Sequence, residues 1–230
     1  MWYAIIDDVI SQIEWNFMCL HLWTFFSNFA LENNLSTQAK NIKLKFSDWR
    51  GFILSGYKIK DSLESLYINQ EKENFFSTFV EINAFRGILW AMLEGIEKDK
   101  KFKRWLTNII KEEQMDVFRY TLRFIRNILS HNIDPEMRLH EHDFRELQRK
   151  IVTLNSPSIK NWIVDFKVDY EKVLPKSWIK NYSFEIKIDF NTLKKGTPFY
   201  QLVPKADIYM LCEFCYNLIV YYKLGLQLEN

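Results

Sequence analysis

The sequence predicts a mainly α-helical bundle with one small β-hairpin before its last helix. The chain has 230 residues and is 48% hydrophobic, which suffices for a sizeable core. It contains only 6 Gly and 5 Pro, so we expect long helices with few turns between them. Apolar residues recur at steps of three and four along much of the chain, which is typical of helices, and they alternate strictly with polar residues near its C-terminal end.

Two long helices are expected in the first hundred residues, over residues 2–31 and 74–98. The apolar stripe of the first consists of Ile6, Val9, Ile13, Phe17, Leu20 and Trp23. The inward positions of the second are Phe79, Ile82, Phe85 and Leu89. Between the helices, residues 41–70 form a mixed segment, in which Gly51 and Gly56 interrupt short helical patterns.

A third helix is predicted over residues 105–131, after a basic run at residues 98–104. We interpret this run as a solvated linker, and the alternative is contact with nucleic acid. One face of this helix is apolar and consists of Phe118, Leu122, Ile125 and Leu129. Another face, here called the arginine stripe, consists of Asp116, Arg119, Arg123, Arg126 and Ser130. Pro135 predicts that the helix ends soon after His131.

The rest of the chain is predicted to hold three helices and the hairpin. The helices cover residues 143–154, 159–174 and 205–224. Apolar and polar residues alternate from Tyr182 to Phe190, which predicts a strand with one buried face. A turn at residues 194–196 and a short return strand at residues 199–203 complete the predicted hairpin.

The third helix ends in the sequence Arg126-Asn127-Ile128-Leu129-Ser130-His131-Asn132. A guanidinium stays charged and binds phosphate oxygens, so Arg126 can stabilise charge that builds up on phosphorus. A histidine exchanges protons near neutral pH, so His131 can act as a general base or acid. Because RNA carries its own nucleophile in the 2′-hydroxyl, these two groups supply most of what RNA cleavage without a metal requires.

Arg126 and His131 can act on one phosphate only if the helix departs from regular geometry between them. Five residues of regular helix correspond to about 140° of rotation, so we expect the helix to end or distort near Ser130 and to swing the imidazole back towards Arg126. Asn127 lies about one turn before His131 and is expected to fix the orientation of its ring.

The motif and its context, LRFIRNILSHNI, resemble the R-x4-6-H motif of the HEPN superfamily, many members of which are endoribonucleases. The resemblance implies that Arg126 and His131 are catalytic, with Asn127 at the variable polar position between them. It implies a metal-independent endoribonuclease that leaves 2′,3′-cyclic phosphate and 5′-hydroxyl ends. It further implies a toxin or abortive-infection effector of anti-phage defence that works as a homodimer, with two motifs facing one another in a composite site.

The resemblance also suggests how the chain is organised. A single HEPN-like domain over residues 1–230 would have its core helices at about 75–155. Residues 1–70 would then be a helical extension, and residues 180–203 a hairpin insertion. Ile133 stands where toxin members controlled by AMP transfer carry a Tyr, so that control is not expected, although an antitoxin or other regulatory partner remains an expectation.

RNA contacts must come from local clusters, because the formal net charge is only +2. Arg119, Arg123 and Ser130 share the arginine stripe with Arg126 and are expected to bind RNA; the alternative is that the arginines form ordinary salt bridges. For the whole chain, the alternative to an enzyme is a non-catalytic HEPN-like module that binds RNA, nucleotide or a protein partner. In a third interpretation, the motif is only a helix cap.

No metal or cofactor is expected. Cys212 and Cys215 form a lone C-x-x-C pair on an apolar helix, whereas a structural zinc site needs four ligands. His140 and His142 are two residues apart and do not share a helix face, and Asp143 is expected as an N-cap. Motifs of nucleotide hydrolysis, dinucleotide redox and serine hydrolase chemistry are missing from the sequence.

Four tryptophans, at helical spacing among apolar residues, are assigned to the core: Trp15, Trp23, Trp90 and Trp105. The apolar segments at residues 17–31 and 208–224 contain polar breaks, so we interpret them as core helices and not as membrane spans. The first residues are acidic where a signal peptide would be basic, and we expect a cytoplasmic protein.

Overall fold

The computed structural model describes residues 3–33, 44–45, 53–54, 70–131, 137–154, 159–169 and 183–228. The chain divides into two compact units. The main unit comprises residues 1–17 and 82–230, and the small unit comprises residues 18–81. All the residues predicted to act in catalysis or RNA binding belong to the main unit, so the candidate site is built within it.

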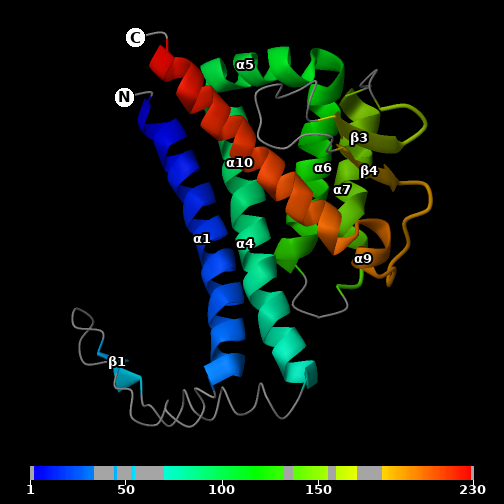
Figure 1. Cartoon of the computed structure of the whole chain (residues 1–230). Helices are drawn as coiled ribbons and strands as arrows, with labels where there is room; N and C mark the ends of the chain where they lie inside the picture. The colour runs from blue at the N-terminus through cyan, green and yellow to red at the C-terminus, as the bar shows by residue number, and fades with distance from the viewer. Residues whose placement is uncertain are drawn as a thin grey trace. The chain divides into compact units, whose positions relative to one another are not determined.

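The chain is mainly α-helical, and the two long helices of its N-terminal half are confirmed (Figure 1). α1 spans Tyr3–Asn33 and α4 spans Gln70–Lys98. Within the main unit, both helices bury the apolar positions that the periodicity predicted, including Ile6, Val9, Ile13, Ile82, Phe85 and Leu89. The helical period of three to four residues therefore identified the core-facing side of both helices.

In the small unit, the described part of the segment between these helices is extended. β1 (Leu44–Lys45) pairs antiparallel with β2 (Ile53–Leu54). The short helical patterns that the sequence suggested for residues 41–70 otherwise lie outside the described residues.

The predicted third helix is in fact two helices. α5 covers Lys100–Ile110 and α6 covers Glu112–His131, and Lys111 between them has a φ of 68°. A lysine at positive φ ends a helix without Gly or Pro, so the sequence pattern does not reveal the corner. Asp99 is the N-cap of α5, because its carboxylate accepts hydrogen bonds from the backbone N–H groups of Lys101 and Phe102. The basic run at residues 98–104 thus lies mostly within α5 and is not a linker.

The hairpin before the last helix is present, but its second strand is not the predicted one. β4 spans Ser183–Asp189, as its alternation predicted, and it pairs antiparallel with β3, Ile163–Asp169. The helix predicted at residues 159–174 is therefore wrong. β3 buries Val164, Phe166 and Val168 and exposes the residues between them, so it has the same two-residue period as β4.

The predicted return strand at residues 199–203 is also wrong, because Phe199–Leu202 form the short helix α9. Pro198 precedes its first turn, and Phe199 packs against Phe124 of α6 with ring centroids 6.4 Å apart. The two remaining helices of this region are confirmed: α7 spans Glu141–Leu154 and α10 spans Lys205–Leu228.

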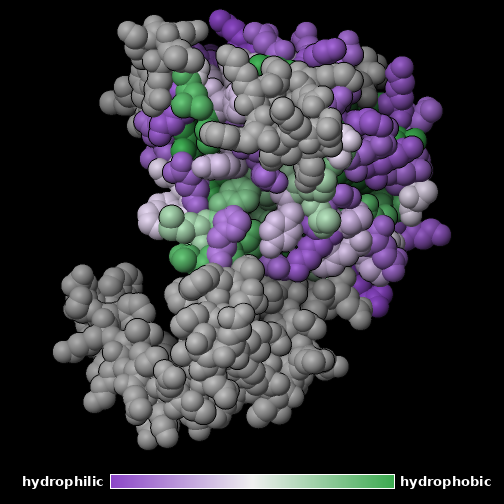
Figure 2. Space-filling model, in the orientation of Figure 1, coloured by the Kyte–Doolittle hydropathy of each residue, from purple (hydrophilic) through white to green (hydrophobic). Residues whose placement is uncertain are grey.

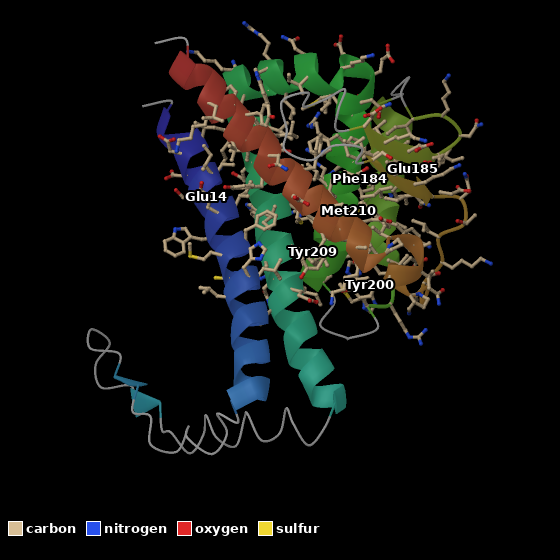
Figure 3. The ribbon with its side chains drawn as sticks, viewed as in Figure 1. Glu14, Phe184, Glu185, Tyr200, Tyr209 and Met210 are labelled. Carbon is tan, nitrogen blue, oxygen red and sulfur yellow. The ribbon has the colours of Figure 1, made fainter. Side chains whose placement is uncertain are left out.

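Aromatic side chains connect α6, the hairpin and α10 in the core of the main unit. Phe118 of α6 lies 4.9 Å from Phe166 of β3 and 6.0 Å from Phe214 of α10, measured between ring centroids. Phe184 of β4 lies 6.1 Å from both Phe166 and Phe214. Figure 3 shows Phe184 and its neighbour Glu185 on opposite sides of β4, the first buried and the second exposed. This cluster anchors the buried face of α6, and with it the arginine stripe on the other face.

Among the helices that the structure describes, none is long and apolar enough to cross a membrane. On the face of the main unit seen in Figure 2, hydrophilic residues gather over α5 and the hairpin. Two of the tryptophans that we had assigned to the core are exposed: Trp15 by 64% and Trp90 by 49%. Trp105 packs against Tyr222, and the side chain of Trp23 lies outside the described residues.

Candidate functional site

α6 presents the two faces that the sequence predicted. Its apolar face is buried, with Phe118, Leu122, Ile125 and Leu129 at most 1% exposed. The arginine stripe is partly exposed along its whole length, from Asp116 to Ser130. His131 is the last residue of the helix, and its side chain is 48% exposed.

The expected distortion near Ser130 is not found. α6 is helical through His131, and the Ser130 hydroxyl donates a hydrogen bond of 2.7 Å to the backbone carbonyl of Arg126. Arg126 and His131 therefore project from the helix about 140° apart. The first contacts α4 and the second contacts the start of α7. A phosphate that touches both groups must bridge two sides of α6 or receive the groups from two chains.

Arg126 forms a pair with an exposed tryptophan. Its Cζ lies 5.2 Å from the centre of the Trp90 ring on α4, within the range of a cation–π interaction. The Arg126 Nε is buried and makes no hydrogen bond within the described residues. Burial, followed by the charge of Arg123, lowers the pKa of Arg126, although an arginine in a protein stays protonated near neutral pH. The guanidinium thus lies over the Trp90 ring, and the tryptophan, which is 49% exposed, remains accessible beside a fixed positive charge.

His131 belongs to a second group of side chains, here called the histidine cluster: His131, His142 and Asp143. The His131 Nδ1 lies 4.0 Å from the Asp143 Oδ1, and the His142 Nε2 lies 3.3 Å from the same oxygen. The two imidazole rings have their centroids 4.8 Å apart. Both histidines are exposed, whereas Asp143 is only 1% exposed, so a buried carboxylate faces two accessible rings.

Asp143 is positioned by the first turn of α7. The sequence predicts Asp143 as the N-cap, but α7 begins at Glu141, so Asp143 is the third residue of the helix and His140 precedes it. The Asp143 Oδ2 accepts a hydrogen bond of 2.7 Å from the backbone N–H of His140, which is one half of a capping box. This arrangement ties one carboxylate oxygen to the backbone and turns the other towards the histidines. A negative charge is also favourable at the N-terminus of a helix.

The other arginines of the stripe are engaged in ion pairs. Arg123 pairs with Glu97 of α4, and Arg119 lies 3.7 Å from Asp116 on its own helix. The hydrogen bond from Arg123 lowers the pKa of Glu97, and burial of the carboxyl opposes this effect. The salt bridges that we had weighed as the alternative are therefore present, and RNA contact by Arg119 and Arg123 stays a prediction.

Asn127 and Ser130 are the two further predicted site residues on α6. Within the described residues, no hydrogen bond joins Asn127 to His131, and the side chain that faces the imidazole Nδ1 is Asp143. The Ser130 hydroxyl is used within α6, so as an RNA ligand it would act through its remaining acceptor capacity. Asn132, Ile133 and Pro135 lie outside the described residues.

The cysteine pair has the core role that the sequence predicted. Cys212 and Cys215 are both fully buried in α10. Burial raises the pKa of both thiols, so they stay neutral at physiological pH. A neutral, buried thiol is a poor nucleophile and a poor metal ligand.

Sequence reasoning missed Trp90 and underrated His142 and Asp143. The exposure of Trp90 has a sequence signal that was not used: Arg86 and Glu94 lie four positions from it and Glu97 lies seven positions away, so Trp90 is on the polar face of α4. His142 and Asp143 are eleven and twelve positions after His131, and only the packing of α7 against α6 brings them to it.

No protein-family model matches the chain, and neither a curated protein nor a solved structure matches it. The resemblance to the HEPN superfamily therefore rests on the motif residues themselves.

Proposed function

We propose that this chain is a metal-independent endoribonuclease of the HEPN type. The observation that carries the proposal is the placement of His131: an exposed imidazole at the end of an arginine-striped helix, with its Nδ1 turned towards the buried carboxylate of Asp143. A carboxylate on that side of the ring favours a proton on Nδ1 and leaves the Nε2 lone pair available to a substrate. Asp143 acts in this proposal as a positioning residue.

The proposed reaction uses the RNA's own 2′-hydroxyl as the nucleophile. The Nε2 of a histidine removes the 2′-hydroxyl proton, and the oxygen attacks the adjacent phosphorus. The bond from phosphorus to the 5′-oxygen breaks, and that oxygen takes up a proton from the protonated imidazole. The products are a 2′,3′-cyclic phosphate and a 5′-hydroxyl end. Arg126 stabilises the negative charge on the phosphoryl oxygens in the transition state.

Substrate binding is assigned to the neighbourhood of Arg126. Unpaired bases stack on aromatic side chains, and Trp90 presents such a ring beside the guanidinium. A base on Trp90 would bring its phosphate close to Arg126. Arg123 and Arg119 would add phosphate contacts once the RNA competes with Glu97 and Asp116 for them.

A homodimer accounts for the separation of the two catalytic groups. Arg126 and His131 contact different neighbouring helices, so one copy does not present them as a single pair. Two copies whose motifs face one another supply an Arg126 from one chain and a His131 from the other at a shared cleft. We propose that this composite site cleaves RNA as a toxin or anti-phage defence effector, held inactive by a regulatory partner.

The decisive experiment compares the wild-type protein with His131→Ala and Arg126→Ala on total RNA in the presence of a chelator. We expect the wild type to generate new 5′-hydroxyl ends, and each variant to lose about 100-fold or more of the rate. His21→Ala, which changes a histidine of α1 outside the main unit, is the matched control and should cleave normally. Cleavage that persists in both site variants, or that stops in chelator, would contradict the mechanism.

The second candidate is a non-catalytic HEPN-like module that binds RNA, nucleotide or a protein. The ion pairs on Arg119 and Arg123 favour it over a strongly basic nuclease surface. It predicts RNA binding with no cleavage products. It also predicts that the wild-type gene is cloned as readily as its His131→Ala version, whereas a toxic nuclease resists cloning until His131 is changed.

A further inference from the structure

Three potential metal ligands converge between the end of α6 and the start of α7. His131, His142 and Asp143 each offer one ligand atom, and these three atoms lie within 4.8 Å of one another. The His131 Nδ1 and the His142 Nε2 are the nitrogens that face the Asp143 carboxylate. The sequence spacing of His140 and His142 argued against a metal at this point. His131 changes that argument, because it comes from a different helix and supplies the second imidazole.

The distances fit a small tetrahedral ion. Zinc binds histidine nitrogen and carboxylate oxygen at about 2.0–2.2 Å, so two ligands of a tetrahedral site are about 3.3 Å apart. The His142 Nε2 is 3.3 Å from the Asp143 Oδ1, and the His131 Nδ1 is 4.0 Å from it. The three ligand atoms lie within 4.8 Å of one another, so the longest separation must shorten by at most about 1.5 Å, which rotation of the two exposed histidine side chains can supply.

The surroundings of the cluster also suit zinc. The Asp143 Oδ2 is held by the His140 backbone N–H, and this second contact fixes the direction in which Oδ1 points. The rings of His140 and His142 stack at 8°, with centroids 5.5 Å apart, which restrains the His142 ring. His131 and His142 are 48% and 58% exposed, so an ion can enter and keep a water molecule as its fourth ligand. Two nitrogens and one carboxylate favour zinc over magnesium or calcium.

We propose that His131, His142 and Asp143 form a zinc site, and that zinc bound there inhibits RNA cleavage. The inhibitory role rests on the proposed function, whereas the binding site does not. Zinc takes the lone pair of the His131 Nδ1, so the ring proton must reside on Nε2. The imidazole then has no lone pair with which to accept the 2′-hydroxyl proton. A nuclease that needs no metal for catalysis would in this way be switched off by one.

The first test measures zinc binding alone, by isothermal titration of the metal-free full-length protein with Zn²⁺. We expect one ion per chain, and binding that is weakened about tenfold or more in His142→Ala and in Asp143→Asn. His21→Ala is the matched control, since it removes an exposed imidazole of α1 that offers no atom to the cluster, and it should bind zinc as the wild type does. The absence of binding, or equal binding by His142→Ala, overturns the site whether or not the protein cleaves RNA.

The second test measures the ratio of RNA cleavage rates with and without Zn²⁺ for each variant. Inhibition of the wild type that is relieved by chelator and weakened in His142→Ala supports the regulatory role. Normal zinc binding with an unchanged cleavage rate overturns inhibition but leaves the site intact. Normal zinc binding by a protein that never cleaves RNA overturns the proposed function and keeps the zinc site.

Discussion

Trp90 is the residue whose exposure most directly suggests contact with a substrate. Its ring is 49% exposed and lies beside the Arg126 guanidinium. Stacking of a base on an aromatic side chain contributes about 1–3 kcal/mol to RNA binding, so Trp90→Ala should raise the KM for RNA about tenfold. Because stacking acts on bound substrate and transition state alike, kcat should change little. Steady-state cleavage of a short single-stranded RNA measures both constants.

A second exposed tryptophan of the main unit, Trp15, provides the control for this prediction. Trp15 on α1 is even more exposed, so Trp15→Ala removes an equally accessible indole elsewhere and should leave the KM unchanged. Trp90→Phe retains an aromatic face and should bind RNA nearly as the wild type does. If Trp90→Ala lowers kcat at constant KM, the ring positions Arg126 and does not bind the base.

The ion pair between Arg123 and Glu97 makes stability depend on pH in the acid range. The hydrogen bond from Arg123 lowers the pKa of Glu97 below its ordinary value of 4.5. Such a carboxylate stabilises the fold above its unfolded pKa, and this contribution is lost as the pH falls through the lower, folded pKa. We expect Glu97→Gln to lower the Tm at pH 7. The loss in free energy of unfolding should be less than about 1 kcal/mol, because the pair is partly exposed.

The Tm difference between the wild type and Glu97→Gln should shrink to nothing as the pH is lowered well below 4.5. Glu14→Gln changes an exposed glutamate of α1 that has no ion pair within the described residues, and serves as the control. A Tm difference that stays constant from neutral to acid pH would show that the pair does not couple stability to this titration.

At the scale of elements, the corner between α5 and α6 is set by one strained residue. Lys111 has a φ of 68° and a ψ of 149°, a backbone conformation that residues other than glycine rarely adopt. Lys111→Gly should therefore stabilise the protein by about 1 kcal/mol, the strain released less the entropy that glycine adds to the unfolded chain. Chemical denaturation measures the gain. Lys111→Ala keeps the strain, and an equal gain in that variant would point to the lost charge as the cause.

The same corner illustrates which elements a sequence can reveal. The faces of α6 were predictable because apolar residues recur every three to four positions, and this pattern can be recognised without knowledge of tertiary contacts. The break at Lys111 was not, since neither Gly nor Pro marks it. In β3 the alternation of Val164, Phe166 and Val168 is present, but a seven-residue signal was interpreted as part of a longer helix. β3 becomes recognisable through its pairing with β4, which is a long-range contact.

Only part of the candidate site was predictable, because some of its contacts join residues that are far apart in the sequence. Arg126 and His131 are neighbours in sequence, and the chemistry of their side chains is evident from their types. The histidine cluster depends on the packing of α7 against the end of α6, which no spacing rule gives. The exposure of Trp90 was predictable, because Arg86, Glu94 and Glu97 share its face of α4.

At the scale of the whole molecule, the geometry of α6 makes the homodimer testable by mixing two inactive proteins. Arg126→Ala retains His131, and His131→Ala retains Arg126. If the site is composite, a heterodimer joins one intact group from each chain. Random exchange makes half of the dimers mixed, and each mixed dimer has one of its two cross-chain pairs intact, so we expect about a quarter of wild-type activity.

Cleavage by the mixture, measured after exchange of subunits under mild denaturant and compared with each variant alone, decides between two arrangements. Restoration requires that Arg126 and His131 act across the interface, as expected from their contacts with different helices. If the mixture stays as inactive as its components while sizing shows that mixed dimers form, both groups must act from one chain, and RNA would then have to span two sides of α6. The double variant Arg126→Ala/His131→Ala mixed with wild type controls for dilution, because its heterodimers contain no intact cross-chain pair.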